Sequence, residues 1–131
     1  MVLILILEWT ILNLSQNELK KFKIPSPSLD CEILLSKVLN VKREYLLTNL
    51  DKKITEREKN FFIKCINRRK KKEPIAYIVG QKEFWKYNFK VNKNVLIPRP
   101  DTEALVEEAI ANIPINSSFR ILDVGTGSGC V

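Results

Sequence analysis

Residues 120–131, with the sequence RILDVGTGSGCV, join a short apolar run to a loop that carries three glycines. The run contains Ile121, Leu122 and Val124, so it is apolar on both faces, which is typical of a central parallel strand covered by helices on each side. Glycines then alternate with small polar residues through residues 125–129. A glycine lets the chain turn sharply and lets backbone amides approach a ligand closely. The stretch therefore predicts a buried strand that ends in a nucleotide-cofactor loop.

The loop has the spacing GxGxG and follows an acid, Asp123. This spacing differs from the GxGxxG of dinucleotide enzymes and excludes a GxxxxGK[ST] phosphate loop. Two apolar residues followed by Asp-x-Gly-x-Gly-x-Gly resemble the first motif of class I S-adenosylmethionine (SAM) methyltransferases. The resemblance implies that the methionine part of SAM is cradled by Gly125, Thr126, Gly127, Ser128 and Gly129. A plain flexible turn is the alternative interpretation of three closely spaced glycines.

Composition excludes several kinds of catalytic site. The chain has 131 residues, a net charge of +7 and no histidine. Without histidine it contains no Ser-His or Cys-His nucleophilic pair and no His-ligated metal. Its cysteines, Cys31, Cys65 and Cys130, are odd in number, far apart and not in a CxxC pattern. They predict neither a zinc site nor a disulfide framework, so we expect reduced thiols in a cytoplasmic protein.

Residues 1–7, MVLILIL, are strongly apolar but too short to span a bilayer. They lack the basic start and small-residue cleavage site of a signal peptide. A buried first helix or strand is the expectation, and no membrane contact is predicted. The alternative is that a displaced start codon adds a few non-native residues.

The first seventy or so residues predict helices. Ser26-Pro27 gives a capping residue followed by proline at the first helical position. A second, short helix fits residues 42–50, and the capping box Thr55-Glu56-Arg57-Glu58 opens a third. The helical stripes are Leu29, Ile33, Leu34, Leu35, Val38 and Leu39 before Asn40, and Phe61, Phe62, Cys65 and Ile66 in the third helix.

The third helix finishes in the basic run Arg68-Arg69-Lys70-Lys71-Lys72. One interpretation is a patch that meets nucleic acid or an acidic protein. The other, which we favour, is a solvated last turn whose cations complement the helix dipole.

After Pro74 the pattern changes. β-Hairpin strands are predicted by Phe84, Trp85, Tyr87, Phe89 and Val91, with a turn at residues 92–94 before the apolar residues 95–97. The five aromatics between Tyr77 and Phe89 also suit plain packing between two halves of the chain. Pro98-Arg99-Pro100 is a rigid extended stretch, and Asp101-Thr102-Glu103 begins a helix that reaches about Asn112.

Four blocks in this order resemble the HemK/PrmC family of peptide chain release factor glutamine methyltransferases. The blocks are SPSLDCEILL (26–35), EPIAYIVG (73–80), LIPRPDTE (96–103) and LDVGTGSG (122–129). The resemblance implies a mainly α N-terminal domain that recognises the release factor (1–73), a β-hairpin connector (74–97), and the first helix and strand of a Rossmann-like SAM domain (98–131, incomplete). The implied reaction moves a methyl group from SAM to the side-chain amide nitrogen of glutamine in the Gly-Gly-Gln motif.

The resemblance also places Phe84 near the substrate pocket, and Arg99 and Pro100 in the wall between the connector and the SAM site. Lys86 stands where the family has a glycine, which puts the local turn in doubt. The family's Asn-Pro-Pro-Tyr motif, which orients the amide, has no counterpart in these 131 residues. We therefore expect a fragment without catalytic residues of its own, inactive unless another polypeptide completes it.

Two further hypotheses stay open. The helical domain alone is a non-catalytic binding module for a release factor or another acidic partner. Alternatively, the SAM enzyme acts on nucleic acid, in line with the charge of +7. We rank that last and expect no direct nucleic-acid contact, because the N-terminal blocks point to a protein substrate.

Overall fold

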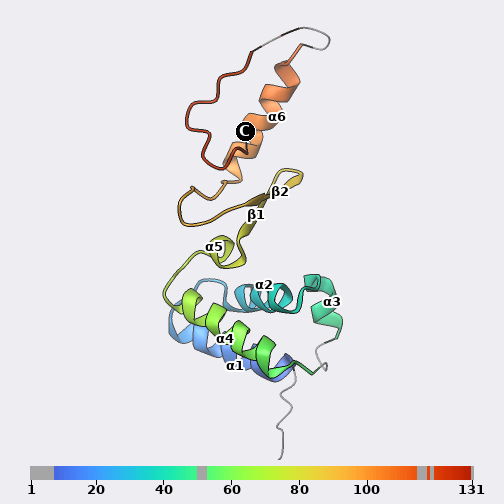
Figure 1. The fold of residues 1–131 in the computed structure, drawn as a ribbon, viewed down its shortest axis with the longest axis vertical. Coiled ribbons are helices and arrows are strands. Elements are labelled where there is room, and N and C mark those ends of the chain that lie inside the picture. Colours follow the sequence, from blue (N-terminus) through green and yellow to red (C-terminus); the bar gives the residue numbers. More distant parts are fainter. Residues whose placement is uncertain (1–7, 50–52, 115–117, 119, 131) are drawn as a thin grey trace, which may run out of the picture. The chain divides into compact units, whose positions relative to one another are not determined.

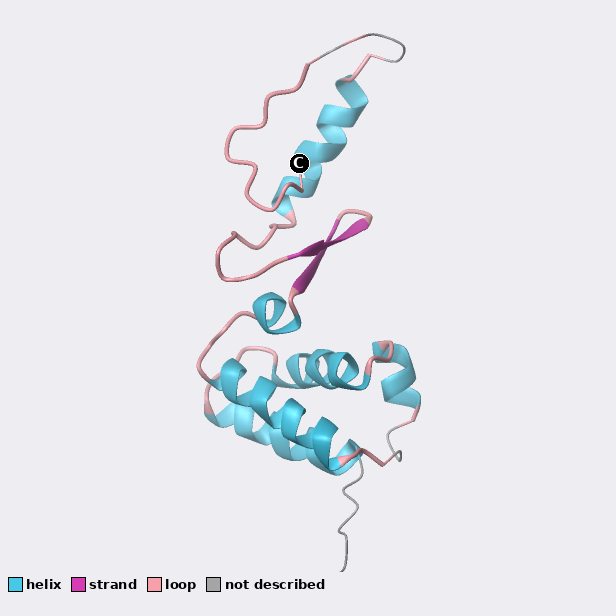
Figure 2. Ribbon diagram, in the orientation of Figure 1, coloured by secondary structure: helices cyan, strands magenta, loops and turns pink. Residues whose placement is uncertain are grey.

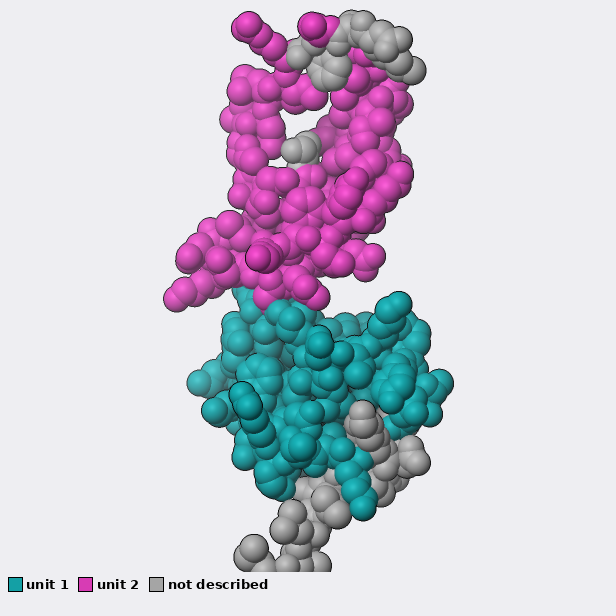
Figure 3. Space-filling model, turned by 45° about the vertical axis from the view of Figure 1, so that its right-hand side comes forward, with its two compact units in different colours: residues 1–79 teal, residues 80–131 magenta. Residues whose placement is uncertain are grey.

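The computed structural model describes residues 8–49, 53–114, 118 and 120–130. The chain forms two compact units, Met1–Val79 and Gly80–Val131 (Figure 3). The expectation for residues 1–7 lies outside the described residues. Our three-part division of the chain stays a prediction, because these two units do not separate a connector from a SAM domain. No helix in the described part of the chain is both long and apolar enough to cross a membrane.

Unit 1 is all helical, as the sequence predicts (Figures 1 and 2). Helices α1, α2 and α4 contact one another, while the short helices α3 and α5 pack on α2. The helices are α1 (Glu8–Lys21), α2 (Pro27–Leu39), α3 (Arg43–Thr48), α4 (Glu56–Lys70) and α5 (Ile75–Val79).

The core of unit 1 lies between these helices and is formed by Ile11, Leu12, Leu19, Ile24, Cys31, Leu34, Leu35, Leu46, Ile54, Phe62, Cys65 and Ile66. Two residues expected on core faces are exposed instead, namely Leu29 and Phe61. Phe62 shares its helix face with both Cys65 and Ile66, at i+3 and i+4, whereas Phe61 lies at the edge of that face. Leu29 lies off the row of Cys31, Leu34 and Leu35, which defines the buried face.

The helix starts follow the capping signals. At α4 the capping box is confirmed: the Thr55 amide donates to Glu58 Oε2 at 2.8 Å, and the Glu58 amide donates to Thr55 Oγ1 at 3.2 Å. Helix α2 begins at Pro27 as predicted, but the Ser26 hydroxyl makes no capping bond to the helix backbone. It donates instead to the Asp30 carboxylate, Oγ to Oδ1 3.1 Å.

Unit 2 contains the antiparallel hairpin β1 (Gln81–Phe84) and β2 (Tyr87–Lys90), followed by α6 (Asp101–Asn112). The hairpin is confirmed, but its turn is at Trp85-Lys86, where Phe84 pairs with Tyr87. Residues 92–94 form a separate turn after β2, closed by the Asn94 amide on Asn92 Oδ1 at 2.9 Å. No strand forms at residues 95–97.

The strand expected at residues 121–124 does not form. Leu122 and Val124 are each 86% exposed. A strand needs a neighbour that accepts and donates its backbone hydrogen bonds. Within the described residues the only sheet is β1–β2, whose strands pair with each other. The helical and hairpin parts of the expected fold are therefore present, while the Rossmann-like part is not confirmed.

Candidate functional site

The glycine loop has the backbone that close ligand approach requires. Gly125, Gly127 and Gly129 have φ angles of +90°, +57° and +73°, in the region that glycine enters without strain. At Gly125 and Gly129 an added Cβ would meet nothing within 4 Å, so the loop is open around these positions. The Gly129 amide donates to the Thr126 carbonyl at 2.9 Å and closes a tight turn. The loop thus folds back on itself, and no other described atom covers Gly125 or Gly129 at the position of a Cβ.

Asp123, two residues before Gly125, carries a buried carboxylate oxygen that lacks a partner among the described residues. Among the described residues, no donor reaches Asp123 Oδ2. The Thr126 hydroxyl donates to the Asp123 backbone carbonyl at 3.3 Å, so it leaves the side chain unsatisfied. A buried acceptor without a donor costs about 1–3 kcal/mol. The position therefore suits a ligand that brings an N–H or O–H group, which the methionine end of SAM does.

The residues predicted for the substrate pocket divide into a buried one and two exposed ones. Phe84 is 2% exposed and meets Phe89 edge to face, with 6.0 Å between ring centroids. Arg99 and Pro100 are exposed directly before α6. No hydrogen bond or ion pair among the described residues joins any of these three to the glycine loop. The structure therefore does not bring the two groups of predicted site residues together.

A contact that sequence reasoning missed ties the hairpin turn to α6. The Trp85 amide donates to Oε1 of Glu103 at 2.9 Å. Glu103 lies in the first turn of α6, where an acid also complements the helix dipole. The only sequence signal for this contact is the acid in the Pro-Arg-Pro-Asp-Thr-Glu block. The contact fixes the turn beside Phe84 relative to the segment that carries Arg99 and Pro100.

The turn also answers the doubt raised by Lys86. Trp85, the residue before it, takes the left-handed conformation, with φ +53°. For a residue with a Cβ this costs about 1–2 kcal/mol. The Lys86 ammonium lies 4.4 Å from the centroid of the Trp85 ring, a cation–π distance that offsets part of the cost. The hairpin therefore closes without the family's glycine.

The basic run at the end of α4 is mostly neutralised. Three of its five residues form ion pairs within unit 1: Arg68 with Glu73, Arg69 with Asp30, and Lys70 with Glu18. Hydrogen bonds from Lys21 and then Lys70 hold the pKa of Glu18 below its ordinary value. The Arg68 guanidinium does the same to the pKa of Glu73. These pairs leave little free charge for a nucleic-acid patch here.

Comparison with known proteins gives a consistent assignment. The family model described as the PrmC N-terminal domain matches residues 10–80. A relative named release factor glutamine methyltransferase, from Leptospira interrogans, is 46% identical over 93% of this chain and 43% of its own length. One of the same name from Coxiella burnetii is 47% identical over 81% of this chain and 38% of its own.

A third relative, the bifunctional methyltransferase of Rickettsia felis, is 40% identical over 92% of this chain and 28% of its own length. The chain thus spans less than half of the length of these curated relatives. The domain model alone covers more than half of the 131 residues. The chain therefore belongs to the HemK/PrmC family, as its four sequence blocks indicate.

Proposed function

We propose that this chain is the first part of a SAM-dependent methyltransferase that methylates the side-chain amide nitrogen of glutamine in the Gly-Gly-Gln motif of peptide chain release factors. The observation that carries the proposal is identity of 46–47% to relatives named release factor glutamine methyltransferase. The identity extends over 81–93% of this chain, so it includes LIPRPDTE and most of the helical unit.

In this proposal the glycine loop holds the methionine end of SAM. Gly125, Thr126, Gly127, Ser128 and Gly129 line that end, with backbone amides that a side chain would otherwise shield. Asp123 Oδ2 accepts a hydrogen bond from the cofactor's amino group, which removes the unsatisfied acceptor. SAM supplies an electrophilic methyl group on a sulfonium.

The difficult part of the reaction is the nucleophile. The nitrogen of an amide attacks poorly because its lone pair is delocalised, so the enzyme must fix the amide in line with the methyl group. Phe84, Arg99 and Pro100 contribute walls to that pocket, and Glu103 positions the hairpin turn through the Trp85 amide. In this proposal residues 1–73 recognise the release factor and residues 98–131 begin the SAM domain. Residues 74–97 connect these two parts.

We further propose that these 131 residues are inactive by themselves. The chain has no Asn-Pro-Pro-Tyr motif to hold the two amide hydrogens. The relatives extend well beyond the aligned region, so a complementing polypeptide would supply the missing orientation. The loop alone also lacks contacts to adenine and ribose, so we expect weak or undetectable SAM binding by the chain alone.

The test mixes the chain with the non-aligned remainder of the Leptospira relative, a release factor and SAM. Mass spectrometry of the Gly-Gly-Gln peptide should show one added methyl group only when both polypeptides are present. Gly127→Val should abolish methylation, because its φ of +57° is strained for a branched side chain. Lys93→Val, at an exposed site outside the glycine loop, is the matched control. Methylation by the chain alone refutes the inactivity, and a complemented mixture that binds SAM without methylating refutes the substrate.

The second candidate function is a non-catalytic binding module. It is favoured by the continuous core of unit 1, which draws on α1, α2, α3 and α4. A pull-down of a purified release factor tests it. Binding at micromolar concentration without any complementing polypeptide supports the module, and no binding counts against it.

A further inference from the structure

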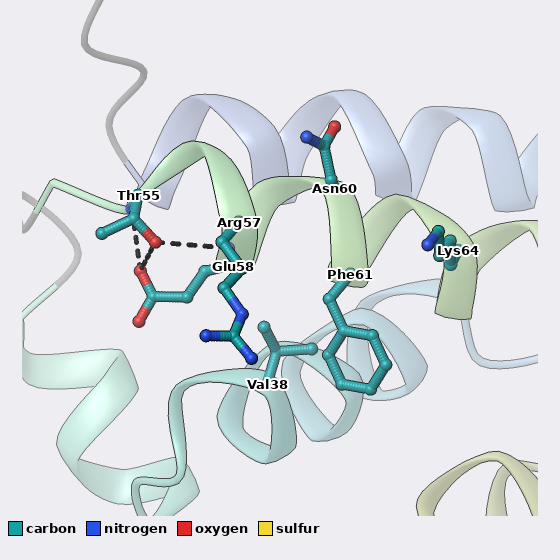
Figure 4. Close-up of a pocket in the computed structure, with 7 residues that line it drawn as sticks. All are labelled: Val38, Thr55, Arg57, Glu58, Asn60, Phe61 and Lys64. Carbon is teal, nitrogen blue, oxygen red and sulfur yellow. Dashed lines mark hydrogen bonds between the residues drawn. The ribbon is translucent and has the colours of Figure 1, made fainter.

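A groove of about 680 Å³ opens between α2 and α4 of unit 1 (Figure 4). In Figure 4 the side chains of Arg57 and Phe61 extend from α4 toward Val38 of α2. Phe61 is 54% exposed, so a large aromatic surface faces solvent in a helix whose next residue, Phe62, is fully buried. The lining consists of Val38, Thr55, Arg57, Glu58, Asn60, Phe61 and Lys64.

The charges of α4 divide according to this groove. The helix carries six basic residues. Four are neutralised in ion pairs, namely Lys59, Arg68, Arg69 and Lys70. Arg57 and Lys64 form no ion pair with any described residue, and both line the groove. The uncompensated positive charge of α4 is therefore concentrated at this one place.

The acid at the rim of the groove does not neutralise these cations. Glu58 Oε2 accepts hydrogen bonds from the Thr55 amide at 2.8 Å and from the Thr55 hydroxyl at 2.6 Å. The carboxylate is thus committed to the capping box that starts α4. An incoming acidic group would meet Arg57 and Lys64 without displacing an internal pair.

The spacing defines the chemistry of the occupant. Arg57, Phe61 and Lys64 are at i, i+4 and i+7, which places them on one face of the helix with the two cations ~10 Å apart along its axis. A partner helix with an apolar side chain between carboxylates repeats this spacing. We propose that the groove docks an acidic, amphipathic helical segment of a protein partner. Its apolar side chain covers Phe61, and its carboxylates pair with the two cations.

This docking surface goes beyond methyl transfer and does not require the partner to be a release factor. A nucleic acid fits less well, because phosphates need a continuous basic stripe. Here the two cations flank an apolar centre, and the neighbouring cation Lys59 is already paired with Glu56.

The experiment measures binding of the full 131-residue chain by fluorescence anisotropy. The probe is a capped, labelled, helix-forming peptide with glutamates at i and i+7 around a leucine, and its partner peptide has glutamines instead. We expect the acidic peptide to bind. The double variant Arg57→Gln with Lys64→Gln should lower the affinity for this peptide about ten-fold. Lys20→Gln with Lys42→Gln removes the same charge from exposed sites outside the groove and should leave affinity within about two-fold.

Phe61→Ala is the second, uncharged variant and should also weaken binding, because it removes exposed aromatic surface and leaves both cations in place. Circular dichroism verifies that each variant keeps its helices. Equal weakening by the two double variants would mean non-specific attraction and would overturn the proposal. So would equal binding of the glutamine peptide, or absence of binding. Tighter binding of a single-stranded RNA oligonucleotide, lost in the Arg57/Lys64 variant, would reassign the groove to nucleic acid.

Discussion

Replacing Arg69 by methionine should strongly destabilise unit 1, because it breaks a largely buried ion pair. Arg69 Nε donates to Asp30 Oδ2 at 2.7 Å, and Nη1 donates to the Glu73 carbonyl at 3.0 Å. The two side chains of the pair are only 14% and 6% exposed. After the change, the Asp30 carboxylate keeps the hydrogen bond from the Ser26 hydroxyl, at 3.1 Å, but loses its cation. Removing one partner of a buried pair costs about 3–5 kcal/mol. Because Arg69 keeps some exposure to solvent, we expect the free energy of unfolding to fall by about 3 kcal/mol.

Thermal unfolding followed by far-ultraviolet circular dichroism measures this loss, because unit 1 contains most of the helices. For a domain of this size 1 kcal/mol shifts the midpoint by about 4–8 °C, so Arg69→Met should lower it by about 12–24 °C. Asp30→Asn in the same chain removes the unpaired charge and should restore part of the loss. A coupling energy between the two changes below about 0.5 kcal/mol would refute the claim that the pair acts as a unit.

Two substitutions and one labelling experiment test other features. Thr55→Ala removes the cap of α4 and should lower the free energy of unfolding by about 1 kcal/mol in urea; an unchanged midpoint would contradict the capping role. Glu103→Ala frees the Trp85 amide, whose hydrogen exchange should accelerate about ten-fold by NMR, whereas equal rates would show that the contact does not hold the turn. Burial, and then nearby acids, raise the pKa of the Cys31 thiol to about 12, so at mildly alkaline pH it stays protonated. Thiol reagents should label half-buried Cys130 first, and prompt labelling of Cys31 in the folded chain would contradict its burial.

Contacts close in sequence were predictable, and contacts distant in sequence were not. The box of Thr55 and Glu58 joins residues only three positions apart, so the pattern alone contains both partners. The pair of Asp30 and Arg69 joins residues 39 positions apart. The sequence alone favours a solvated run around Arg69, because nothing local reveals that α2 brings a buried acid to it.

The same limit explains the outcome at the candidate site. The glycines predicted an open, sharply turning loop, and their positive φ angles agree with that local requirement. The strand before the loop depends on a neighbouring strand, which no pattern within Ile121–Val124 can supply. Glu103 was recognised as an acid at a helix start, but its bond to Trp85 depends on where the hairpin turn lies.

The two units differ in how much of their apolar surface they bury, and this difference bears on function. Unit 1 has a continuous core in which Leu35 and Phe62 are fully buried, and it leaves Phe61 and Leu14 more than half exposed. Unit 2 buries Phe84 in the hairpin, whereas Leu105 on α6 and Leu122 before the loop are open to solvent. Apolar surface that a chain leaves open is covered when a partner or further polypeptide packs on it. The groove on unit 1 is thus best interpreted as a binding surface, and under the proposed function the open faces of unit 2 are covered by further polypeptide of the methyltransferase.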